Sequence, residues 1–224
     1  MTVSTTARRI ALVGLLALVA ALIPLSGASA AHLTGVTDLD ATNNVDAALE
    51  WSTKGAFPMG GLASGARDPQ YVLIGRDDIF PDNLASGALQ GAEGPLLLTD
   101  TDELDQRVID EIDRLGVDEA IILGDEAAIS ADVEAELNDL LSDVSRLGGE
   151  TRIETAIEVT AESGATTAIL ARAFGDGSQS FADSLAAGAW AAADGFGVLL
   201  TQTEVLTGNT ADYLASGDID QVII

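Results

Sequence analysis

Short apolar runs recur along the chain, and none of them alternates between apolar and polar positions as a half-exposed strand would. Continuous apolar runs of four or five residues are typical of strands that are buried on both faces, as in a parallel sheet. The runs of strand length are residues 71–74, 95–99, 120–123, 168–171, 198–201 and 222–224.

The segments between these runs have the length and the periodicity of helices. Segment 103–115 carries one apolar stripe opposite its acidic residues, and segment 130–141 begins with Ser130 and carries a second stripe. The two stripes consist of Leu104, Val108, Ile112 and Leu115, and of Val133, Leu137, Leu140 and Leu141. Because parallel neighbouring strands need a crossover, the order of strands and helices predicts a parallel α/β layer.

The same order of motifs occurs twice. A shift of about 101 residues places Phe80-Pro-Asp-Asn-Leu-Ala-Ser-Gly87 on Phe181-Ala-Asp-Ser-Leu-Ala-Ala-Gly188. One further inserted residue then places Leu97-Leu-Thr99 on Leu199-Leu-Thr201, and Ile121-Ile122 on Ile223-Ile224. A period near 100 is too long for a solenoid. The sequence therefore predicts tandem three-stranded parallel α/β units.

The predicted boundaries are a leader at 1–30, a first repeat at 31–143 and a second repeat at 144–224. The leader has the features of a secretion signal peptide: Arg8 and Arg9, an apolar run of about 16 residues, and Ala28-Ser-Ala30 as a cleavage pattern. An uncleaved membrane anchor is the alternative, although about 20 residues are needed to span a bilayer. The second repeat stops within its third strand, so we expect the sequence to be a fragment of something longer.

The charge balance is strongly acidic. There are 36 Asp and Glu residues against 10 Lys and Arg, giving a net charge of −26, and aromatic residues make up 4% of the chain. Such a surface repels nucleic acid and anionic membranes. Adaptation to high salt is one explanation, since molar salt screens repulsion between carboxylates. A generic acidic secreted protein is the other.

Composition also removes most recognisable enzyme classes. The chain has no cysteine and one histidine, His32, which excludes thiolate chemistry and histidine clusters for metals. The loop Gly175-Asp-Gly-Ser178 lacks the spacing and the lysine of a nucleotide-binding loop. The acidic stretches lack calcium-loop spacing. We therefore expect no catalytic residues, no metal site and no cofactor.

The chain resembles the type 2 cell wall-binding repeat family. The resemblance rests on Arg146-Leu-Gly-Gly-Glu-Thr-Arg-Ile-Glu-Thr-Ala156, the two motifs that end at Gly87 and Gly188, and the two Leu-Leu-Thr strand ends. It implies a Rossmann-like open α/β sandwich in each repeat and a pseudo-threefold packing of three repeats. It also implies an extracellular, non-catalytic module that holds a surface-layer or other wall protein non-covalently on an anionic wall polysaccharide.

The resemblance places the polymer contacts on one element of each repeat. The residues that match the family's Ile-Leu-Leu element are Leu96, Leu97 and Leu98, and Val198, Leu199 and Leu200. Arg152 is a further candidate, because a guanidinium suits phosphate or carboxylate groups. The competing role for Arg152 is an internal ion pair with Glu150 or Glu154. Thr151 and Glu154 themselves have the spacing of a helix capping box.

The sequence is also compatible with two other functions. The chain could be the targeting part of a wall hydrolase, an amidase or a peptidase, whose catalytic domain lies beyond Ile224. It could also be an extracytoplasmic binder of small ligands at the switch point of the sheet.

Overall fold

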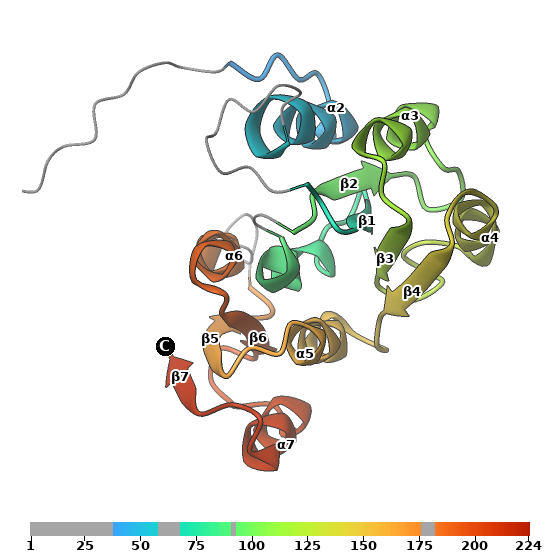
Figure 1. Cartoon of the computed structure of the whole chain (residues 1–224). Coiled ribbons are helices and arrows are strands. Elements are labelled where there is room, and N and C mark those ends of the chain that lie inside the picture. The colour runs from blue at the N-terminus through green and yellow to red at the C-terminus, as the bar shows by residue number, and fades with distance from the viewer. Residues whose placement is uncertain (1–37, 58–67, 91–92, 176–181) are drawn as a thin grey trace, which may run out of the picture. The chain divides into compact units, whose positions relative to one another are not determined.

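The computed structural model describes residues 38–57, 68–90, 93–175 and 182–224 (Figure 1). The predicted leader, His32, Phe181 and most of the loop at 175–178 lie outside these ranges. None of the helices within them combines the length and the apolarity that crossing a membrane requires.

Two parallel sheets form the framework, and the three strands of the second follow the order of the first three strands of the first (Figure 1). The first has the order β2-β1-β3-β4, with β1 (Val72–Arg76), β2 (Leu96–Thr99), β3 (Glu119–Leu123) and β4 (Asp143–Leu147). The second has the order β6-β5-β7, with β5 (Thr167–Arg172), β6 (Gly197–Thr201) and β7 (Gln221–Ile223). Arg76 pairs with Thr99 as Arg172 pairs with Thr201. The predicted fold class of tandem parallel α/β units is confirmed.

The first sheet has a fourth strand that the sequence pattern did not predict. Strand β4 pairs in parallel with β3 from Glu119 opposite Asp143 to Leu123 opposite Leu147. It lies at the edge of the sheet, and none of its side chains is fully buried. Continuous apolar runs reveal strands buried on both faces, so this exposed edge strand gave no such signal. The predicted boundary at 143/144 falls at its first residue.

Helix α2 (Asn44–Glu50) and the π-helical turn η1 (Trp51–Ala56) precede the first strand. The strands are connected by the 3-10 segment η2 (Asn83–Leu89) and by α3 (Gln106–Leu115), α4 (Ala131–Leu140), α5 (Arg152–Glu162), α6 (Ala182–Asp194) and α7 (Gly208–Ser216). Side-chain caps set several starts: Ser130 accepts from the N–H of Val133 at α4, and Thr151 and Glu154 form the predicted capping box at α5.

A threonine at the end of a strand fixes the following loop in both repeats. The Thr99 hydroxyl donates to Glu103 O at 2.8 Å and accepts from the N–H of Asp105 at 2.8 Å. Thr201 makes the same two contacts with Val205 O and the N–H of Thr207, each at 2.9 Å. These bonds hold residues 103–105 outside the helix, which explains why α3 begins at Gln106 rather than at the predicted residue 103.

Helix α5 joins the two sheets into one body. On one side Val159 packs with Leu73 and Leu123 of the first sheet. On the other side Ile153 and Ala156 pack with residues of β5 and β6, and the Thr160 hydroxyl donates to Val198 O at 3.3 Å. The helix therefore covers a face of each sheet (Figure 1).

The equivalent helical segments of the two repeats, η2 and α6, also cross each other. The crossing lies at Gly87 and Gly188, the final glycines of the duplicated motif. A Cβ atom on Gly87 would lie 2.3 Å from Gly188 O, so the backbones meet with no room for a side chain. A Cβ atom on Gly188 would meet only Leu84 O, at an ordinary 3.5 Å.

Carboxylates gather where β3 and β4 begin. Glu119 pairs across the strands with Asp143, and Glu162 at the end of α5 is close enough to act on it. Burial raises the pKa of Glu119, and the charges of Asp143 and Glu162 raise it further. Folding therefore favours the protonated carboxyl, so the charged form at neutral pH weakens the fold.

We expect Glu119→Gln to raise the melting temperature at pH 7 by about 2 °C, because it removes the repelled charge while keeping the shape. Since the folded pKa lies above the unfolded value near 4.5, the contribution of Glu119 to stability is complete at low pH and is lost as pH rises. The advantage of the variant should therefore shrink on acidification to about pH 4. Thermal unfolding at both pH values measures this, and a benefit that grows on acidification would contradict it.

Candidate functional site

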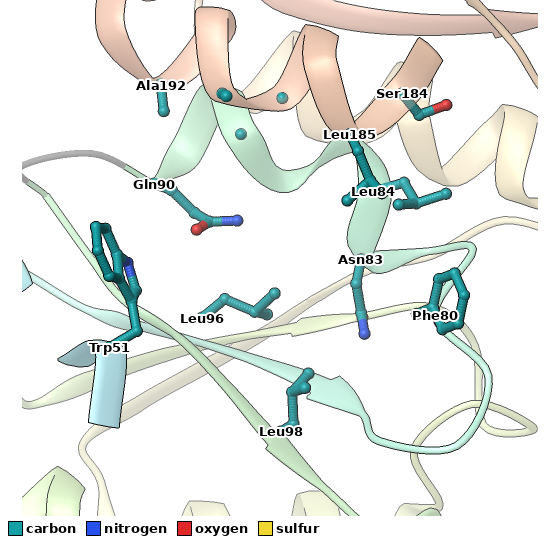
Figure 2. Close-up of a pocket in the computed structure, with 13 residues that line it drawn as sticks. Trp51, Phe80, Asn83, Leu84, Gln90, Leu96, Leu98, Ser184, Leu185 and Ala192 are labelled. Atoms are coloured by element: carbon teal, nitrogen blue, oxygen red, sulfur yellow. The ribbon is translucent and has the colours of Figure 1, made fainter. Parts of the chain in front are cut away.

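A hollow of about 470 Å³ lies over the outer strand of the first sheet, between η1 and α6 (Figure 2). Leu96 and Leu98 of β2 lie between Trp51 and Phe80, which stand at opposite ends of the hollow. Segments η2 and α6 lie on the side facing them, and α6 contributes Leu185, Gly188, Ala189 and Ala192 (Figure 2). The remaining lining residues are Asn83, Leu84, Gly87, Gln90 and Ser184.

A second hollow of about 370 Å³ continues the first toward α2. The two share the lining residues Trp51, Phe80, Gln90, Leu96 and Leu98, and the second adds Asn44, Ala47, Ala48 and Asp77. We call the two together the β2 groove. Its two aromatic side chains are exposed, Trp51 by 53% and Phe80 by 38%.

The alternation of β2 decides which of the predicted leucines reach the groove. Leu96 and Leu98 are partly exposed, whereas Leu97 is fully buried in the core with Val72 and Ile74. Side chains along a strand point alternately to opposite faces. The structure therefore brings two of the three predicted residues of the first repeat to one surface.

The predicted binding residues of the second repeat are buried. Val198, Leu199 and Leu200 are at most 1% exposed, because α5, α6 and η2 all pack near β6. A contact between these side chains and a polymer stays a prediction, as it does for Leu97. The duplicated sequence motif therefore occupies an accessible groove in one repeat and a closed core in the other.

Arg152 lies away from the β2 groove, at the first position of α5. Its Nη1 donates to Ala173 O at 3.1 Å, and its guanidinium lies 4.8 Å from the centroid of the Phe174 ring. Burial lowers the pKa of Arg152, while the charge of Asp82 acts in the opposite direction. The ion pair expected with Glu150 or Glu154 is absent among the described residues; Glu154 instead accepts hydrogen bonds from Thr151 and Asn209.

The other cations of the described ranges are engaged with carboxylates. Arg114, for example, binds Glu111 at 2.6 Å on α3. The pairs are Lys54–Glu50, Arg76–Asp78, Arg107 with Asp46 and Asp105, Arg114–Glu111, Arg146–Glu134 and Arg172–Asp183. Within the same ranges, no three acidic or histidine side chains are grouped as ligands for a metal ion.

The family model described as Cell wall binding domain 2 (CWB2) matches residues 25–134 and 146–224. The chain belongs to this family. The matched segments cover the chain apart from residues 1–24 and 135–145, so the resemblance drawn from the repeated motifs is confirmed.

Solved structures of two cell wall proteins are similar to this chain. Cwp6 from Clostridium difficile superimposes with a TM-score of 0.69 at 19% identity, over 85% of this chain and 30% of that one. Cwp8 from Clostridium difficile superimposes with a TM-score of 0.65 at 26% identity, over 83% of this chain and 30% of that one. This chain thus corresponds to about a third of those proteins. A search of curated proteins gives no match.

Neither the duplicated motifs nor the apolar pattern predicted the aromatic ends of the groove. Phe80 belongs to the duplicated motif, but Trp51 lies in neither the motif nor an apolar run. The available signal was its rarity, since the chain has only two tryptophans and five phenylalanines. A large aromatic residue in an aliphatic protein, on a segment that also carries Lys54 and Glu50, suggests exposure rather than core packing.

Proposed function

We propose that the chain is a non-catalytic, exported module that attaches a protein to the cell wall by binding a wall polysaccharide along the β2 groove. Membership of a cell wall-binding family supports binding to a wall component. The observation that carries the site is the groove itself, in which Leu96 and Leu98 lie between two exposed aromatic side chains. Concave apolar surfaces with a few polar groups are the usual ligand sites of proteins.

The groove is tested with Leu185→Gln. Leu185 is 63% exposed and lines the groove from α6, so the change should alter stability by no more than about 0.5 kcal/mol. We expect it to weaken binding to purified wall polysaccharide about tenfold, since it removes an apolar contact from the middle of the site. Leu140→Gln is the matched control: Leu140 is 47% exposed on α4 and lies outside the groove. Equal binding by the two variants in sedimentation assays would contradict this site.

We also propose that further copies of the repeat complete a pseudo-threefold assembly. The crossing of η2 and α6 supports this, because equivalent segments of two repeats already meet at equivalent glycines. The additional repeat would come from the same polypeptide or from another chain. Linked repeats raise the strength of attachment through effective concentration. The relatives are much longer than this chain, so a hydrolase domain joined to the module is the alternative use of the same attachment.

Adaptation to high salt is the explanation that we favour for the acidic composition. The chain carries a net charge of −26, and repulsion between carboxylates weakens as ionic strength rises. We expect the melting temperature to rise by about 5 °C or more between 0.05 M and 2 M NaCl. Differential scanning calorimetry measures this, and equal stability at both concentrations would leave a generic acidic protein as the explanation.

A further inference from the structure

We propose that the β2 groove takes an uncharged stretch of polysaccharide, held by the apolar faces of its sugar rings against Trp51 and Phe80, and that any anionic groups of the polymer stay outside the groove. This inference rests on the proposed function and names the chemistry of its ligand.

Among the residues that the structure describes, the lining of the main hollow carries no charged side chain. Its polar side chains are the amides of Asn83 and Gln90 and the hydroxyl of Ser184; every other lining residue is apolar. The continuation toward α2 adds one charged side chain, Asp77, which is negative. A phosphate or carboxylate entering this space would lose its hydration without meeting a cation among the described lining residues, which is costly. Sugar hydroxyls, in contrast, can exchange hydrogen bonds with amides and hydroxyls.

The aromatic residues are placed to stack on rings. The axial C–H bonds of a pyranose give it an apolar face, which suits a flat side chain. The Trp51 ring lies directly over Gly55, where a Cβ atom would come within 2.5 Å of the ring. The glycine at position 55 therefore leaves open the space that the indole ring occupies at the end of the groove (Figure 2). A rigid, exposed aromatic side chain gives contact area at a small cost in conformational entropy.

The charged residues outside the groove also favour a neutral ligand. Six of the seven Lys and Arg residues in the described ranges already form ion pairs. The seventh, Arg152, is engaged with Ala173 O and the Phe174 ring and does not line the groove. The described ranges therefore offer a polyanion no unpaired Lys or Arg side chains whose binding would release the counterions of the polymer. Binding should then hold or strengthen as salt rises and screens the repulsion between polymer and chain, unlike binding driven by attraction between opposite charges.

The test compares two forms of one polymer. Wall polysaccharide is used as purified and after its carboxylates have been activated with a carbodiimide and coupled to the neutral amine donor ethanolamine, which converts them to uncharged amides and releases the urea. Binding is followed by tryptophan fluorescence in full chain that carries Trp190→Phe, which leaves Trp51 as the reporter. Trp190 donates to Asp194 and packs edge-on against Phe196, outside the groove.

We expect the neutral polymer to bind as tightly as the native one or up to about tenfold tighter, because repulsion from the acidic chain is removed. Trp51→Ala and Gly55→Ala, assayed by sedimentation in the natural background, should each lose about tenfold in affinity, the second by displacing the indole ring. Trp190→Ala, assayed alongside them, should leave binding unchanged.

The possible outcomes distinguish the neutral groove from the proposed attachment to the wall. Loss of binding on neutralisation, or a steep loss of native-polymer binding with NaCl, would overturn the neutral groove while leaving wall attachment intact. Full binding by Trp51→Ala would also overturn it. Failure of the folded parent chain to bind either polymer would instead overturn the proposed function, and this inference with it.

Discussion

Gly87→Ala is expected to destabilise the protein by about 3 kcal/mol, although alanine is the better helix former by about 1 kcal/mol. The new methyl carbon would lie 2.3 Å from Gly188 O and 2.6 Å from Gly188 Cα, and both of these are backbone atoms. They cannot move aside without shifting α6 against η2. The change would therefore separate the two repeats at their crossing.

Gly188→Ala is the matched control, because it adds the same methyl group to the equivalent position of the other repeat. There the nearest atom is Leu84 O at 3.5 Å, an ordinary contact. The control should be neutral or slightly stabilising. Urea unfolding of both variants measures the difference, and equal stabilities would show that the backbones at the crossing are not in close contact.

Gly75→Ala is expected to cost about 2 kcal/mol, and a second change should remove most of that cost. Gly75 lies in β1, and a Cβ atom there would be 2.1 Å from Oδ1 of the buried Asn83. Asn83 cannot easily yield, because its Nδ2 donates to Arg76 O at 2.9 Å.

The second repeat shows the compensating pair. Gly75 pairs with Leu98 as Ala171 pairs with Leu200, so Ala171 is its counterpart, and Ser184 is the counterpart of Asn83. Ser184 reaches Arg172 O at 3.4 Å with a shorter side chain. The double variant Gly75→Ala, Asn83→Ser should therefore be about as stable as Asn83→Ser alone. A double-mutant cycle in urea measures the coupling; additive losses would contradict the steric account.

Apolar patterning predicted most of the fold because the core is aliphatic and the strands are buried. The predicted run at 120–123 became β3 with one added residue, and Ser130 caps α4 as its position suggested. The pattern failed for β4, whose Asp143, Ser145 and Arg146 interrupt any apolar run. It also placed the start of α3 too early, because the Thr99 hydroxyl holds the loop through contacts that no periodicity encodes.

The candidate site was predictable only in part. Because the two repeats match in sequence, the duplication predicted polymer contacts equally for Leu96–Leu98 and for Val198–Leu200. Whether such a strand meets solvent depends on the helices packed over it, and α5 closes the second strand but not the first. The groove also needs α6 from the other repeat and Trp51 from η1. Those neighbours come from tertiary packing, which local spacing does not report.

Attachment to the wall is most directly tested by co-sedimentation of the purified, folded chain with homologous cell envelopes, at low and molar salt, before and after the envelopes are stripped of polysaccharide. The account predicts that the chain pellets with intact envelopes, stays bound in molar salt, and remains in the supernatant with stripped envelopes. Equal pelleting with intact and stripped envelopes, or none with either, would contradict it.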